Sequence, residues 1–558
     1  MRERKDILLI VFVVAIATRG NCQQPADTQQ TTTLHSTTEL VLVPASVTDL
    51  RGRPRTGLTC ADFSIFDNGV EQQPVSCDEF APPAPAPIPA AAQSVVHCTN
   101  RPGKSRVQGL SIIALDFINS PTGDVARMRD AALRYLSNNV PSDQPIEVVA
   151  LTWKGVRVIH PFTTDNRVLE AAIDRVLKRG GRGASAGTDE RLVSIEANAI
   201  VDDAAKNDEA DAHPSPYFHE EAGYTRDRQW RFVAATLANL AEIANGFAGV
   251  PGRKSLLWAS SGFPFAVLDP TSMLLGSVQH LDYEFVERYN QLWKLLNGAN
   301  VAVYPISLTG ISGNVDYSYD VSRRGKGHFG TQDPSIYDRE QQTKQTFLTF
   351  ASATGGRACV ENNDIAECFR NAEAESRSYY LLAFRVDRTT AKPGWHTLKV
   401  EVKKPGAHVR ARSAYLLSDP DAAPQATPYD QLLAAMRSPL QYTGVVFEVA
   451  WEQPAHPRHP GNTGFALTVL ADGVPASPTQ PVNLRVFAIP MHASVAVEAQ
   501  LDPVDLRLEG LALEQFRQAG VSLHGQLAPP PDCDAVKFLV IDRNSGVIGS
   551  LEVPLAGK

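Results

Sequence analysis

Two oxygen-bearing side chains follow a strongly apolar run in the segment 111-SIIALDFINSPTGD-124. Asp116 ends the run, Ser120 comes four residues later, and Ile118 between them has no side-chain oxygen. An aspartate at the start of a loop often accepts hydrogen bonds from backbone N–H groups. Carboxylate and hydroxyl oxygens are also the ligands that hard divalent cations prefer. The segment therefore raises a choice between a loop cap and a cation site, of which we favour the cap.

Residue patterns typical of enzymes are missing from the chain. The segment 258-WASSGF-263 lacks the spacing of a nucleophile elbow, and 180-GGRGAS-185 lacks the Lys-Ser/Thr ending of a phosphate loop. No motif places a base beside a serine, and the histidines do not have the spacing of metal ligands: His160, His213, His219, His280 and His328. We expect the protein not to be an enzyme.

Charge and the N-terminal residues bear on partner and compartment. The net charge is -8 and both signs are intermixed, which argues against a nucleic-acid partner. The basic MRERKD precedes a short apolar run, 7-ILLIVFVVAIA-17, which is typical of a signal peptide. We expect residues 1–22 to direct export, to the outside of the cell or to the periplasm and cell envelope. No membrane span would remain after cleavage; the alternative is an uncleaved anchor.

Six cysteines remain once that leader is removed, and an oxidising compartment permits disulfide bonds between them. Cys359 and Cys368 are close in sequence and are the first candidate pair. Cys60 and Cys77 are the second pair, within one small β region. The zinc alternative is weaker, because the sequence contains no C-x-x-C pair.

Strands and helices alternate in the middle of the chain. Apolar runs at 110–117, 146–153, 254–260 and 301–308 predict buried strands, and helical patterns lie between them. This alternation predicts an α/β fold with a doubly wound, mainly parallel sheet. Ligands of such sheets bind at the carboxyl ends of the strands. Asp116, Ser260, Ser261 and the loop after Leu308 are expected at that edge.

Shifts in composition divide the rest of the chain. The expected units are a leader at 1–22, a small β domain at 23–80, a Pro/Ala-rich linker at 81–106 and the α/β domain at 107–385. A β extension at 386–418, a second linker at 419–430 and a β-sandwich-like domain at 431–558 follow.

Several phrases in order resemble one known family. They include 114-ALDFIN-119, 251-PGRKSLLWASSGF-263, 300-NVAVYPISLTG-310 and 378-SYYLLAFRV-386. The region 107–385 resembles the von Willebrand factor type A domain, and the whole chain resembles secreted bacterial von Willebrand factor A-related proteins. The resemblance implies a Rossmann-like sheet with a metal-ion-dependent adhesion site that grips a protein ligand.

Carried over residue by residue, that adhesion site is degenerate. Asp116 matches the first ligand and Ser120 the last serine, but Ile118 replaces the serine between them. The loop threonine corresponds to Thr188 or Thr225, and Ser261 stands where the family has an aspartate. With one carboxylate instead of two, less charge offsets the dehydration of Mg²⁺. Binding of Mg²⁺ or another divalent cation is therefore expected to be weak or absent.

The leading functional hypothesis is an exported multi-domain binding protein. Its central domain would recognise an unidentified protein ligand, for interaction or adhesion, at the strand-end face. The alternative is a structural or assembly module of the cell envelope without metal-dependent ligand binding. The sequence does not define an oligomeric state.

Overall fold

The computed structural model describes most of the chain beyond its N-terminal segment. The expected leader, most of the first linker, a long insertion after residue 178 and most of the second linker lie outside the described residues. The described residues are 38–80, 98–101, 110–120, 122–137, 145–178, 218–250, 252–263, 283–310, 334–417, 429–452, 463–471, 474, 481–493, 495–497 and 503–555. None of the helices in these ranges combines the length and apolar character that a membrane span requires.

The centre of the molecule is one mixed sheet of five strands in the order β10-β9-β6-β7-β8. Three neighbouring pairs are parallel, and β8 runs antiparallel to β7. Four strands are buried along their whole length, which explains their continuous apolar sequences. The bounds are β6 Leu110–Asp116, β7 Ile146–Thr152, β8 Gly155–Thr163, β9 Lys254–Ser260 and β10 Val301–Ser307.

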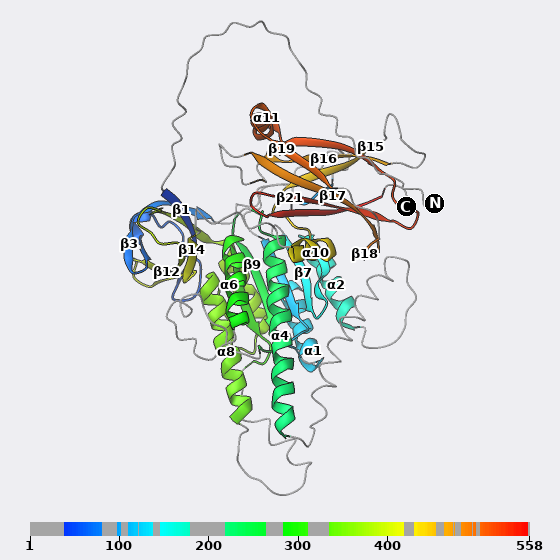
Figure 1. The fold of residues 1–558 in the computed structure, drawn as a ribbon. Coiled ribbons are helices and arrows are strands. Elements are labelled where there is room, and N and C mark those ends of the chain that lie inside the picture. The colour runs from blue at the N-terminus through cyan, green and yellow to red at the C-terminus, as the bar shows by residue number, and fades with distance from the viewer. Residues whose placement is uncertain are drawn as a thin grey trace, which may run out of the picture.

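Helices cover both faces of this sheet (Figure 1). One face packs against α1 (Thr122–Ser137), α2 (Asn166–Lys178) and α9 (Ile365–Arg377). The other face packs against α4 (Phe218–Gly246), α6 (Tyr283–Gly298) and α8 (Pro334–Thr354). Alternate residues of each strand contribute to the two cores, as the pleat of a strand requires.

An N-terminal β unit packs beside this sheet and is built from two distant parts of the chain. Its four-stranded sheets have the orders β13-β1-β11-β4 and β14-β12-β2-β3, and both contribute residues to one core. Its elements are β1 Thr38–Asp49, η1 Cys60–Asp62, β2 Phe63–Asp67, β3 Val70–Gln72, β4 Pro74–Phe80, β11 Tyr379–Asp387, β12 Gly394–Val402, β13 Ala407–Ala411 and β14 Ala414–Leu417.

A C-terminal unit is a sandwich of two antiparallel sheets around its own core. The sheets have the orders β20-β16-β15-β5 and β18-β17-β21-β22, with β19 also paired to β17. Its elements are β5 Cys98–Thr99, α10 Tyr429–Arg437, β15 Phe447–Glu452, β16 Thr463–Val469, β17 Val482–His492, β18 Val495–Ala496, β19 Val504–Leu508, α11 Leu511–Ala519, β20 Val521–Leu527, β21 Ala535–Asp542 and β22 Ile548–Pro554.

The predicted fold class is wrong. We expected an α/β protein with a doubly wound, mainly parallel, Rossmann-like sheet, flanked by an N-terminal small β domain and a C-terminal β-sandwich-like region, but the described strands lie mostly in antiparallel sheets and no doubly wound parallel sheet is present among them. Parallel pairing is confined to the one mixed sheet. The error arose because the alternation of strands and helices describes only the central sheet, whereas most of the described strands lie in the antiparallel sheets of the two flanking β units.

Strand pairing also joins segments that the sequence analysis assigned to separate units. Strand β1 pairs antiparallel with β11 over eight residue pairs, so the small β domain and the β extension form one unit. The end of the Pro/Ala-rich segment joins the sandwich, because Cys98 and Thr99 pair with β15. The chain is thus closed on itself twice, once in each β unit.

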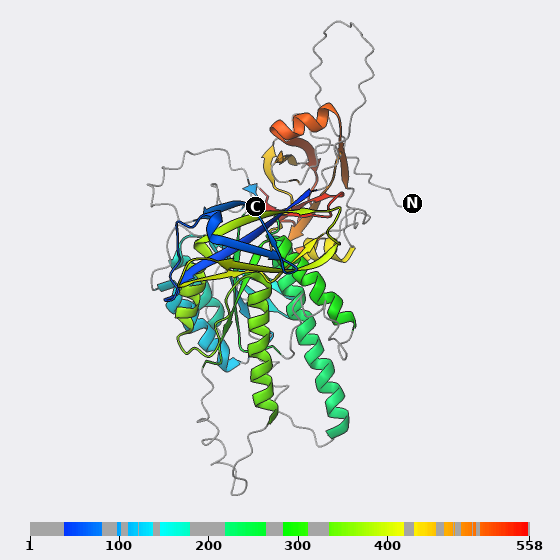
Figure 2. The same ribbon diagram turned by 90° about the vertical axis from the view of Figure 1, so that its left-hand side faces the viewer.

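Both β units attach at the end of the mixed sheet where its parallel strands begin. The backbone N–H of Thr443 donates to Gly246 O at 2.8 Å, at the C-terminal end of α4. The Arg253 N–H, just before β9, donates to the Tyr379 hydroxyl of the N-terminal β unit at 3.3 Å. Figures 1 and 2 show α4 and α8 extending in the opposite direction, past the strand ends.

Close backbone packing at this joint leaves no room for a side chain at Gly249. A Cβ at Gly249 would lie 1.6 Å from the Thr443 carbonyl oxygen, whereas a Cβ at Gly298 would meet nothing within 4 Å. We predict that Gly249→Ala lowers the free energy of unfolding by about 2 kcal/mol or more, because the backbone must shift. Gly298→Ala, the matched control, is expected to change it by no more than about 1 kcal/mol. Urea unfolding of the two variants measures both values, and equal stability would contradict the joint.

Glu147 on β7 is a buried carboxyl whose Oε2 has no hydrogen-bond partner within the described part of the chain. Burial raises the pKa of Glu147 to about 8. The folded chain therefore keeps a proton that the unfolded chain releases above its ordinary pKa of about 4.5. The stability due to this group is fully present below pH 4.5 and is lost as the pH rises to 8.

We predict that Glu147→Gln removes this dependence, because the amide does not titrate. The melting temperature of the variant relative to the wild type should rise from about pH 4.5 to about pH 8 and then level off. Thermal unfolding at a series of pH values measures the difference. A difference that is independent of pH would show that Glu147 is ionised in the folded chain.

Candidate functional site

Three of the sequence-predicted site residues meet at the carboxyl ends of β6 and β9. Asp116 is the last residue of β6, and Ser260 is the last residue of β9. The Ser261 N–H donates to Ser120 Oγ at 3.2 Å, which ties the two loops together. Because β6 and β9 are parallel neighbours, their ends reach the same edge of the sheet. We call this edge, with the loops after β6, β9 and β10, the strand-end face.

The carboxylate of Asp116 is fully occupied by N–H donors. Its Oδ1 accepts from the backbone N–H groups of Ile118 at 2.9 Å and Asn119 at 3.0 Å. Its Oδ2 accepts from the Asn119 side-chain amide at 2.8 Å and from the Trp258 indole at 3.1 Å. The side chain thus caps its own loop and anchors it to the neighbouring strand, as expected for an aspartate in this position.

Burial makes this arrangement unsuitable for a cation. Asp116 is completely buried, which raises the pKa of its carboxyl, while hydrogen bonds from Asn119, Ser260 and Trp258 lower it. Ile118, where a metal site of this kind needs an oxygen ligand, is buried in the apolar core. In the described part of the chain, no group of three or more His, Cys, Asp or Glu side chains is placed to hold a metal ion. The residues present do not fit a divalent cation.

The remaining predicted ligands divide into placed and unplaced residues. Ser120 is buried, and Ser261 is half-buried with its Oγ inside and without a hydrogen-bond partner among the described residues. Thr188 lies outside the described residues. Thr225 belongs to α4, in a part of that helix whose side chains are also outside the description. The structure therefore brings together Asp116, Ser120 and Ser261, but not as a ligand set.

The loop after β10 completes the strand-end face. The Leu308 N–H donates to Ser260 O at 3.1 Å, and its carbonyl oxygen accepts from the Arg127 guanidinium of α1 at 2.8 Å. The hydroxyls of Ser307 and Thr309 are 2.9 Å apart, and Thr309 is exposed. The loops of the strand-end face are thus hydrogen-bonded to one another and to α1 beneath exposed polar side chains.

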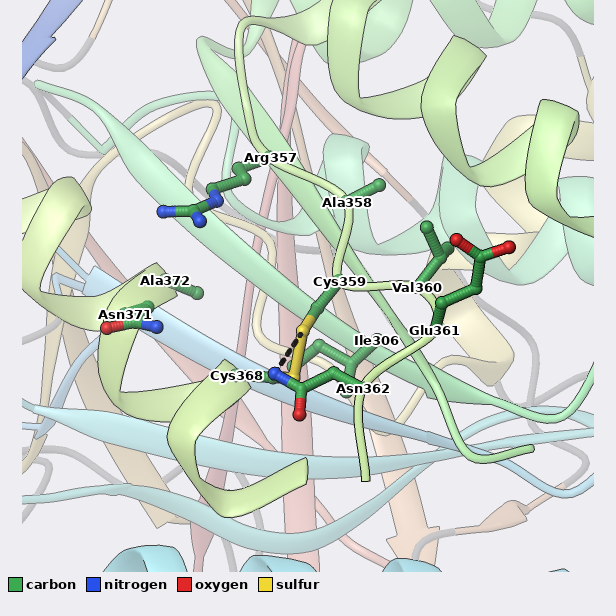
Figure 3. A pocket seen from close by; sticks show the side chains of 10 residues that line it. All are labelled: Ile306, Arg357, Ala358, Cys359, Val360, Glu361, Asn362, Cys368, Asn371 and Ala372. Atoms are coloured by element: carbon green, nitrogen blue, oxygen red, sulfur yellow. Dashed lines mark hydrogen bonds between the residues drawn. A yellow bond between two sulfur atoms is a disulfide. The ribbon is translucent and has the colours of Figure 1, made fainter. Parts of the chain in front are cut away.

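Both disulfide bonds predicted from the sequence are present. Cys60 of η1 is bonded to Cys77 of β4, and Cys359 is bonded to Cys368 of α9. The second bond lines a cavity of about 220 Å³ between α9 and the segment that follows α8 (Figure 3). Ile306 of β10 also lines this cavity, which places it beside the strand-end face.

Two residues important for the site were not assigned this role from the sequence. Trp258 supplies the indole N–H that holds Asp116 Oδ2, and Asn119 bridges Asp116 to the Thr236 hydroxyl of α4 at 2.8 Å. One signal was available for Trp258, because a tryptophan in a fully buried strand needs an acceptor for its N–H. No sequence pattern indicates that Thr236 lies opposite Asn119.

No family model matches this chain, and no curated protein matches it.

We predict that Asp116→Asn lowers the free energy of unfolding by about 3 kcal/mol, because one amide end cannot accept from the N–H donors that surround it. The control is Asp130→Asn, whose carboxylate is 59% exposed and whose loss should cost less than about 0.5 kcal/mol. Urea unfolding measures both variants. Adding Mg²⁺ should leave the wild-type midpoint unchanged, and a rise that disappears in Asp116→Asn would reveal a cation site instead.

Proposed function

We propose that the chain is an exported, non-catalytic binding protein that recognises another protein through the strand-end face without a metal ion. One observation carries the proposal. Both β units attach at the opposite end of the mixed sheet, so no described residue of either unit contributes to this face. The helices α4 and α8, which pack on one face of the sheet, extend beyond the strand ends (Figure 2).

Independence from metal follows from the hydrogen bonds of Asp116. Adhesion through a cation requires a carboxylate with free lone pairs, and both oxygens of Asp116 accept N–H donors. Recognition would instead rest on exposed polar groups around the face, such as Thr309, Gln345 and Asn363. Polar rims of this kind are common in non-obligate protein interfaces. The sequence resemblance to von Willebrand factor A-related proteins also supports a binding role, because the resemblance implies recognition of a protein ligand.

The alternative, a structural or assembly module of the envelope, is favoured by the way the units interlock. The N-terminal β unit is held to α9 by a bidentate ion pair, in which Arg410 contacts the buried Glu375 at 2.7 Å through two nitrogens. The sandwich is held to α4 through Ser438, which donates to Glu242. Such joints favour a rigid body over independently moving domains, which suits a scaffold as well as a receptor.

A pair of surface variants tests the binding face. We predict that Thr309→Arg, at the strand-end face, abolishes capture of the partner from envelope extract of the producing organism, because a long charged side chain obstructs the contact. Thr390→Arg, in the exposed turn after β11, is the matched control and should retain capture. Each chain is immobilised, and the bound proteins are compared by mass spectrometry with and without chelator.

The outcomes separate the two functions. A protein captured by the wild type and the control, lost in Thr309→Arg and insensitive to chelator supports the proposal. Capture lost with chelator would contradict the metal-free interface. Equal capture by all three chains would place any contact elsewhere on the molecule and would favour the structural alternative.

A further inference from the structure

The Cys359–Cys368 disulfide differs from a purely internal cross-link because it forms part of a cavity wall. The cavity of about 220 Å³ is lined by both cysteines and by polar side chains that include Arg357, Asn362 and Asn371. Figure 3 shows the sulfur–sulfur bond at the centre of this group, with Asn362 beside it and Glu361 directed away. A group that enters the cavity therefore meets the disulfide directly.

The two sulfur atoms are not equivalent. Cys359 lies on the segment after α8 and is partly exposed, whereas Cys368 is 3% exposed and packs in the core beneath α9. An incoming thiolate thus reaches Cys359 Sγ more readily than Cys368 Sγ. Access to one sulfur sets the direction of thiol–disulfide exchange, because the other sulfur becomes the leaving group.

Two features of the surroundings favour a thiolate. Cys368 lies in the first turn of α9, where the helix N-terminus favours negative charge, whereas its burial and the carboxylates of Asp364 and Glu367 oppose it. The Asn362 side-chain amide donates to Cys359 Sγ at 3.8 Å, which favours a thiolate at that sulfur as well. Stabilising the reduced pair makes a disulfide easier to reduce.

We propose that Cys359–Cys368 is a thiol–disulfide exchange site for a dithiol, approached through the cavity and attacked at Cys359. The first thiolate of the dithiol bonds to Cys359 Sγ, and the Cys359–Cys368 bond breaks to leave the Cys368 thiolate. The second thiolate of the dithiol then attacks its own mixed-disulfide sulfur and releases the Cys359 thiolate. The chain gains two electrons and two protons, and the dithiol becomes a disulfide.

Reduction has a local structural consequence. Residues 359–364 contact the end of β10, since Cys359 N–H donates to Pro305 O and Ser307 N–H donates to Cys359 O, both at 2.8 Å. Glu361 pairs with Lys344 of α8 at 2.7 Å. Without the disulfide, the hydrogen bonds of Cys359 to β10 and the exposed ion pair to α8 still hold the segment, but it loses its link to α9 and becomes more mobile while β10 remains buried.

The test is a titration of the full-length wild-type chain with dithiothreitol, followed by alkylation and peptide mass mapping of each cysteine. Cys60–Cys77 is the internal control, because the pairing of β4 with β11 holds Cys77 in place after reduction. We expect Cys359 and Cys368 to be alkylated at a dithiothreitol concentration about tenfold lower than Cys60 and Cys77. Hydrogen exchange should accelerate at residues 359–364 and stay unchanged in β6 and β9.

Two single variants test the direction of attack. In Cys368→Ser the remaining Cys359 should react with a disulfide reagent at least about tenfold faster than the remaining Cys368 in Cys359→Ser. Opening of both disulfides together, or of Cys60–Cys77 first, in the wild type would overturn the exchange site. Faster reaction of Cys368 would overturn attack at Cys359. The wild-type titration decides the first point even where a variant folds poorly.

Discussion

The buried carboxylate of Asp116 determines how the loops of the strand-end face are built. A carboxylate removed from water must find donors, and here four N–H groups from its own loop and from β9 supply them. The same hydrogen bonds fix the loop so that the Ile118 side chain packs in the apolar core and the Asn119 side chain contacts α4. The loop therefore has a fixed shape without a cation. The hydrogen bond between Ser261 N–H and Ser120 Oγ then joins it to the loop after β9.

The other end of the mixed sheet is specialised for joining. There the chain closes twice, once through β1 and β11 and once through the sandwich against α4. Such contacts involve close backbone approaches, as at Gly249, and buried polar groups that are paired across the joint, as at Glu375. The two ends thus differ in physical character: one is a packed junction, and the other is a hydrogen-bonded surface.

Local sequence was a good guide wherever burial left a strong pattern. The largely apolar, fully buried runs that end at Asp116 and Ser260 are strands close to their predicted bounds, and the close spacing of Cys359 and Cys368 indicated their disulfide. The same emphasis misled the fold class, because the alternation of strands and helices describes only the central sheet. The weaker patterns of β1 to β4 and β11 to β14 gave no sign that they share two sheets.

The sequence by itself determined which strands are buried, that Asp116 stands at a strand end and that Ile118 cannot ligate a cation. Those properties depend on the types of residues that are adjacent in the sequence, so they can be read without knowing the fold. Only the tertiary structure decided that the Trp258 indole reaches Asp116, that β1 pairs with β11 and that the disulfide of Cys359 lines a cavity. These depend on distances between residues far apart in the chain, which are fixed only when the packed cores select one arrangement.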